Sequence, residues 1–112
     1  MDDALREALH LYFGPKEVAL IEKYLQYGEM IGYELLLPRE WASEYVDAAA
    51  QSGCVVLGIE FARSLPRRPI HVTSYADYST GPDAVQKCRE LAQKDLMLWP
   101  SGADWAAFNL KE

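Results

Sequence analysis

Residues 53–62, Gly-Cys-Val-Val-Leu-Gly-Ile-Glu-Phe-Ala, constrain the fold more than any other part of the chain. In an extended backbone, alternate side chains point to opposite faces, and here both rows are apolar until Glu60 interrupts one of them. Strands that are apolar on both faces are typical of a sheet interior covered on two sides. Gly58 leaves room for an element packed close above the strand. We therefore expect a central strand here.

The remaining sequence alternates helical periodicity with turn residues. Four segments carry apolar residues at helical spacing and are bounded by caps or breakers. We expect helices over 3–13, from Pro15 to Gly28, from Pro38 to about 52, and from Asp83 past Leu96, where Asp83 and Gln86 resemble a capping box.

Two further strands are expected, at 70–75 and 104–110, although the latter segment could instead form a short closing helix. Residues 29–37 fit either a short strand or a loop. The connection 63–69 is basic and proline-rich, so we expect it to lie outside the sheet and to join an antiparallel pair. This order predicts a single α+β domain over 1–112, with helices packed on a small, mainly antiparallel sheet.

The length and composition fit one hydrophobic core, since the chain has 112 residues of which 50% are hydrophobic. No run approaches the ~18 apolar residues that would cross a bilayer, and Met1-Asp2-Asp3 has the wrong charge for a secretory leader. We therefore expect a cytoplasmic protein without membrane contact. Cys54 and Cys88 occupy apolar positions, which favours buried free thiols over a disulfide.

The net charge of −6 lies entirely in the first half of the chain. Residues 1–50 contain ten acidic and four basic residues, whereas residues 51–112 contain seven of each. This distribution argues against a nucleic-acid ligand and favours a basic protein partner. The alternative is a surface whose charge only maintains solubility.

Acidic and aromatic residues occur together in this half. On the third helix, three acids adjoin a face that carries Trp41 and Tyr45. We expect both aromatic side chains to face the core and the acids to remain exposed. Tyrosine offers a large contact area at low entropic cost, and acids steer a basic partner. The predicted partner-binding residues are Tyr27, Glu29, Tyr33, Glu34, Glu40, Glu44 and Asp47.

No catalytic, metal-binding or cofactor-binding pattern is evident. The soft metal ligands, His10, His71, Cys54 and Cys88, are scattered without paired spacing, and no glycine-rich phosphate loop follows a strand. We therefore expect a protein that is not an enzyme. Glu60 is either paired with a nearby base or a catalytic acid with a raised pKa. The Pro66–Pro69 run matches a proline-rich docking motif in form, but a hairpin connection with solvated arginines accounts for it better, because both flanks are expected to be strands.

In size and character the whole chain resembles the immunity proteins that bacteria pair with polymorphic or contact-dependent toxins. The Val-Leu-Gly-Ile-Glu run at 56–60 is similar to core strands in some of those families. The resemblance implies a stoichiometric inhibitor of a toxin domain, often a basic nuclease, and it carries over no functional residue.

The leading hypothesis is therefore a non-enzymatic protein-binding domain, an immunity protein that neutralises a cognate basic toxin. One alternative is a small enzyme or ligand-binding domain with a pocket near Glu60 and His71. A second alternative is an adaptor subunit of a larger complex.

Overall fold

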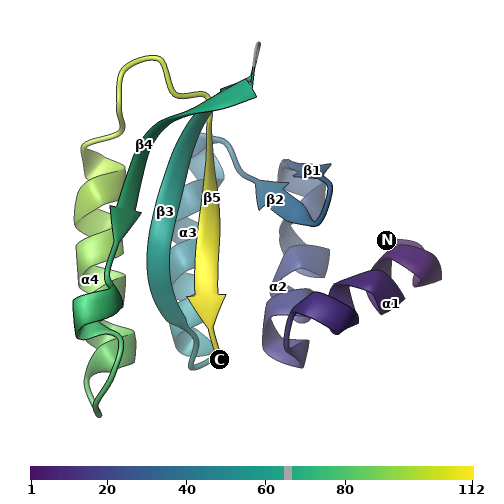
Figure 1. Ribbon diagram of the computed structural model, residues 1–112, viewed down its shortest axis with the longest axis horizontal. Coiled ribbons are helices and arrows are strands. Elements are labelled where there is room, and N and C mark those ends of the chain that lie inside the picture. The colour runs from purple at the N-terminus through teal and green to yellow at the C-terminus, as the bar shows by residue number, and fades with distance from the viewer. Residues whose placement is uncertain (65–66) are drawn as a thin grey trace.

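The expected central strand is β3 (Val55–Ser64), the middle strand of an antiparallel sheet in the order β4-β3-β5 (Figure 1). The structure is a computed structural model that describes residues 1–64 and 67–112. Strand β4 spans Arg67–Ser74, and β5 spans Trp105–Lys111. The segment 104–110 is thus a strand beside the central one, and the closing helix is excluded.

The four predicted helices are present. They are α1 (Asp3–Tyr12), α2 (Pro15–Tyr24), α3 (Arg39–Gln51) and α4 (Ala84–Met97), with short 3-10 turns η1 (Leu25–Tyr27) and η2 (Ala76–Tyr78). Helix α4 packs on β3, and α3 packs on β3, β5 and α4. Both lie behind the sheet in Figure 1. The fold class is therefore α+β, as predicted.

The opposite face of the sheet is not covered by a helix (Figure 1). Glu60 lies on this face between its cross-strand neighbours Val72 and Ala107, and the Val72 side chain is 63% exposed. The expectation of a strand covered on two sides was wrong here. The carboxylate of Glu60 is tolerated because it is half-buried on this helix-free face and interacts with another group of the chain.

The segment 29–37 forms a small hairpin of β1 (Glu29–Ile31) and β2 (Glu34–Leu36). Gly32 turns the chain with a φ of 61°, a value that glycine adopts at little steric cost. Leu37 then joins the hairpin to the main sheet, because its backbone N and O bond with Ala106 at 2.9 and 2.8 Å. The hairpin and α2 are thereby held beside β5.

Two sequence expectations failed in the connections. Arg63, Arg68 and Pro69 belong to β3 and β4, contrary to the prediction that 63–69 lies outside the sheet. Proline fits because β4 is an edge strand and the register shifts near Ala62. Residues 65–66, which include the first proline of the Pro66–Pro69 run, lie outside the described residues.

The capping box at α4 is also absent. Asp83 occupies the N-cap position, but its side chain accepts no capping hydrogen bond, and Gln86 Nε2 instead donates to Glu90 at 3.1 Å.

The core joins both halves of the chain. Tyr45 of α3 is 2% exposed and contacts Tyr24 of α2 edge-on, with ring centroids 5.3 Å apart. Cys54 and Cys88 are buried free thiols, as expected from their apolar positions. Trp41 differs in part from expectation, because it is half-buried and stacks on Tyr27 with ring centroids 3.6 Å apart.

Candidate functional site

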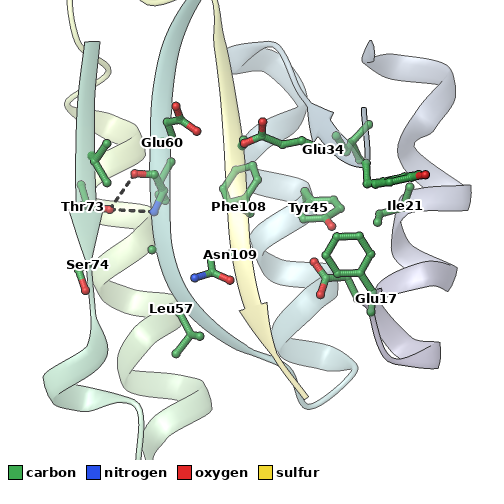
Figure 2. A pocket seen from close by; sticks show the side chains of 17 residues that line it. Glu17, Ile21, Glu34, Tyr45, Leu57, Glu60, Thr73, Ser74, Phe108 and Asn109 are labelled. Atoms are coloured by element: carbon green, nitrogen blue, oxygen red, sulfur yellow. Dashed lines mark hydrogen bonds between the residues drawn. The ribbon is translucent and has the colours of Figure 1, made fainter. Parts of the chain in front are cut away.

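A cleft of about 480 Å³ lies where the open face of the sheet meets α2 and the β1-β2 hairpin (Figure 2). Strands β3, β4 and β5 form one wall, and α2, the hairpin and Tyr45 of α3 form the other. Figure 2 shows Glu60 and Asn109 on the sheet side, with Glu17 and Tyr45 in the gap between β5 and α2. The cleft therefore extends from the open face around the edge of β5.

The strand register fixes the sheet wall. Gly58 lies between its cross-strand neighbours Ser74 and Asn109. Two residues further along β3, Glu60 and its cross-strand neighbour Val72 form the next row on the same face. A Cβ at Gly58 would lie 2.4 Å from the backbone oxygen of Thr73. Glycine is thus required by the close approach of β4 beside the strand, and not by an element packed above it as the sequence suggested.

Glu17 occupies the first turn of α2, where its side chain lines the cleft beside Tyr45. The residue is only 7% exposed. Its position is fixed because the Glu112 carboxylate accepts hydrogen bonds from the backbone N–H groups of Lys16 and Glu17, at 3.1 and 3.3 Å. Among the described residues, no hydrogen bond or ion pair satisfies the Glu17 carboxylate.

Burial, and next the neighbouring charge of Glu112, raises the pKa of Glu17 from an ordinary 4.5 to about 7. The phenol of Tyr45 likewise has a raised pKa, chiefly because it is buried and next because Glu17 lies near. Glu17 therefore changes protonation near neutral pH. In its charged form it can accept hydrogen bonds from a cation that enters the cleft, and in its neutral form it can donate one.

The charged residues that line the cleft are all acidic, namely Glu17, Glu34 and Glu60. No lysine, arginine or histidine among the described residues lines it. Glu34 and Glu60 each already interact with another group of the chain. Aromatic rings from Phe13, Tyr33, Tyr45 and Phe108 supply much of the remaining wall.

No family model, curated protein or solved structure was found to match this chain. Within the described residues, no group of three or more histidine, cysteine or acidic residues could hold a metal ion. No helix in the same residues is long and apolar enough to cross a membrane.

The structure brings together only part of the predicted partner-binding set. Tyr33 and Glu34 line the cleft. Glu29, Glu40 and Glu44 are exposed elsewhere on the first half of the chain, and Tyr27 is half-buried against Trp41.

Asp47 differs from the prediction of an exposed acid. It is half-buried between α3 and α4, where Arg89 Nε donates to it at 2.8 Å and Gln93 Nε2 at 2.9 Å. The sequence could not show this, because the two donors lie more than forty residues away in the chain. Asp47 is therefore a link between helices.

Glu60 and His71 do not share a pocket. Glu60 pairs across the strands with Val72, whereas His71 pairs with Phe61 and so points to the opposite face of the sheet. The cleft contains Glu60 without His71. A cavity over the sheet is therefore present near Glu60, but His71 does not line it.

Glu17 was missed in the sequence, where it reads as an exposed acid of a first helical turn. The sequence nevertheless contained an indication that Glu17 is buried, because Glu17, Ile21 and Tyr24 share one face of a helix at i, i+4 and i+7. Ile21 and Tyr24 are both 2% exposed. An acid at the end of an apolar stripe is therefore a candidate for burial.

Exposed aromatic side chains mark the rim of the cleft. Tyr12 stacks on Tyr33 with ring centroids 4.9 Å apart, and the two residues are 64% and 44% exposed. Leu11, next to Tyr12 in the chain, is 81% exposed, and Ile31, two residues before Tyr33, is 38% exposed. We name these four residues the rim cluster.

Proposed function

We propose that this chain is a non-enzymatic protein-binding domain that recognises a basic partner through the rim cluster and the acidic cleft beside it. The observation that carries the proposal is the exposed Tyr12–Tyr33 stack, with Leu11 and Ile31 also exposed within two residues of it in the chain. Contiguous exposed apolar side chains bordered by polar groups are typical of protein interaction sites. Tyrosines are frequent among the residues that dominate binding energy.

The charge of the surface supports a basic partner. The rim cluster belongs to the half of the chain that contains ten acidic and four basic residues. Glu29 and Glu34 lie in the same hairpin as Tyr33, and the cleft has no basic lining residue among those described. Such a surface attracts a basic partner over a distance of about 8–10 Å at physiological salt and repels acidic ones.

In its finer form, the proposal is an immunity protein that acts in the cytoplasm and neutralises a cognate basic toxin, such as a nuclease, by stoichiometric binding. The support is the small acidic α+β domain with its exposed aromatic and acidic surface. An adaptor subunit of a permanent complex would use the same surface, so the activity of the partner distinguishes these two forms.

The cleft favours a second candidate function, a ligand-binding domain or small enzyme. Its volume of about 480 Å³ lies within the range of small-molecule sites, and Glu17 is a buried group with a raised pKa. A small molecule that raises the melting temperature and protects the cleft would support this candidate.

The proposed function can be tested by photocrosslinking in cells of the organism that encodes the chain. A benzophenone amino acid placed at position 33 should crosslink to a basic protein. The same amino acid at position 78 is the control, because Tyr78 is 50% exposed but lies on η2, away from the cleft lining.

The crosslinked protein is then purified, and its association with wild type, Tyr33→Ala and Tyr78→Ala is measured at several salt concentrations. We expect Tyr33→Ala to weaken binding at least tenfold, Tyr78→Ala to leave it unchanged, and association to slow as salt rises. Inhibition of a toxic activity at a 1:1 ratio would support the immunity form. Equal crosslinking at both positions, or binding that is indifferent to Tyr33, would overturn the proposal.

A further inference from the structure

Glu17 is largely buried and has no partner among the described residues, a combination that disfavours the charged form of its carboxylate. A buried carboxylate is ordinarily paired or hydrogen-bonded, because removing its charge from water is unfavourable. Here the residue is 7% exposed, and no described group of the chain pairs with its carboxylate. Its oxygens line a cleft that leads to solvent.

The surroundings of Glu17 fit the stem of a long cationic side chain. Phe13, Ile21 and Phe108 line the cleft and provide apolar contacts for methylene groups. Tyr33 lies in the same wall and belongs to the rim cluster. A cation that enters past the rim would therefore meet apolar contacts first and a carboxylate at the end.

We propose that Glu17 anchors an alkyl-linked cation, the side chain of an arginine or lysine, that enters the cleft from a bound partner. This inference rests on the proposed function and adds to it the chemistry that the cleft selects. The ion pair would satisfy the buried carboxylate, and charge-assisted hydrogen bonds of this kind are among the strongest in proteins. Glu34 and Glu60, which have interactions of their own, are not required for it.

Binding should depend on pH, because only the charged carboxylate attracts a cation. The titratable groups that face Glu17 are Tyr45 of α3, Cys54 before β3 and Glu112 after β5, with Lys16 next to it on α2. The phenol and the thiol have raised pKa values, chiefly through burial, and so stay neutral near pH 7. Glu112 opposes the ionisation of Glu17, and an arriving cation would favour it.

The test uses N-acetylargininamide and N-acetyllysinamide as probes, with the citrulline analogue as the neutral control. Backbone amide shifts of 15N-labelled protein are followed at pH 6 and pH 8. Both cationic probes should shift the amides of Ile21 and Asn109, more strongly at pH 8, whereas the citrulline analogue should not. Stronger binding of the arginine probe would assign the cleft to a guanidinium, and stronger binding of the lysine probe would assign it to an ammonium.

Glu17→Gln should weaken the binding of the cationic probe at least tenfold. Glu7→Gln is the matched control, since Glu7 is exposed on α1 and does not line the cleft. A second measurement needs no variant: the pKa of Glu17, followed by 13C NMR, should fall when the cationic probe binds. Equal binding of the citrulline analogue, unchanged binding by Glu17→Gln in a folded protein, or a constant pKa of Glu17 would each overturn the inference.

The experiments distinguish an incorrect cation anchor at Glu17 from an incorrect protein-binding function. If the probes do not bind while the crosslinked partner still depends on Tyr33, the cation anchor is refuted and the protein-binding function stands. If the probes bind but no partner depends on Tyr33, the cleft belongs to the ligand-binding alternative.

Discussion

Replacing Glu17 by glutamine should stabilise the protein at high pH and not at low pH. Glutamine has nearly the same size and carries no charge, so the substitution removes the cost of burying an ionised group and keeps the packing. The pKa of Glu17 in the folded protein is about 7, and its ordinary value is 4.5. At ~1.36 kcal/mol for each pH unit, this difference corresponds to an upper limit of ~3 kcal/mol.

The sign follows from proton linkage. A carboxyl group whose pKa is raised by folding binds its proton more tightly in the folded state. The resulting stability is fully present below about pH 4.5 and is lost as the pH rises through about 7. The wild type should therefore lose up to ~3 kcal/mol relative to Glu17→Gln between pH 4.5 and pH 8.

The assay is urea unfolding of wild type and variant, followed by tryptophan fluorescence at half-unit steps from pH 4.5 to pH 8.5. The quantity of interest is the free energy of unfolding of the variant minus that of the wild type, because titration of all other groups cancels in this difference. It should rise by roughly 2–3 kcal/mol and level off above about pH 8.

Glu22→Gln provides a control with the opposite sign. Its hydrogen bond with Arg6 lowers the pKa of Glu22, so this acid stabilises the fold above its unfolded pKa, and that contribution is lost as the pH falls. The difference for Glu22→Gln should therefore decrease as the pH rises towards and past its ordinary pKa of 4.5, so this control is also measured below pH 4.5. A difference for Glu17→Gln that stays constant with pH would refute the burial of a charged Glu17.

Three further outcomes are expected, each measured by chemical denaturation or thiol titration. Asp47→Asn should cost about 1 kcal/mol, because it weakens the link to Arg89, whereas Glu40→Gln, at an exposed position of the same helix, should cost less than about 0.5 kcal/mol; equal costs would contradict the link between helices. Gly58→Ala should cost ~1–3 kcal/mol, since the added Cβ would meet the backbone oxygen of Thr73 at 2.4 Å, and an unchanged midpoint would refute this contact. Both cysteine thiols should react with a thiol reagent in denaturant and only slowly in the folded protein, and rapid reaction without denaturant would contradict their burial.

The helices and the main strands could be predicted because local periodicity and breakers define them. Pro15 at the first turn of α2 and the double apolar row of β3 are examples that need no knowledge of distant residues. The short connection between β3 and β4 also indicated their antiparallel pairing, whereas 104–110 fitted either a strand or a closing helix. These features depend on interactions within a few residues, and a single sequence contains them.

The cleft could not be predicted, because tertiary placement creates it. The hairpin is held beside β5 by the bridge from Leu37 to Ala106, and nothing in the local sequence specifies that register. Asp47 appeared to be a surface acid until the fold brought Arg89 to it. His71 and Glu60 appeared to be neighbours until the strand pairing placed them on opposite faces.

The burial of Glu17 connects the stability of the chain with its proposed function. A domain that needed only solubility from its acids would keep them in water, as it does with Glu40 and Glu44. Holding Glu17 at 7% exposure makes the fold less stable at neutral pH, and no described group of the chain offsets this cost. A cation supplied by a partner would offset it, so binding should both recover the lost stability and remove its dependence on pH. The Glu17→Gln variant, which is stabilised without a partner, should gain less from binding than the wild type does.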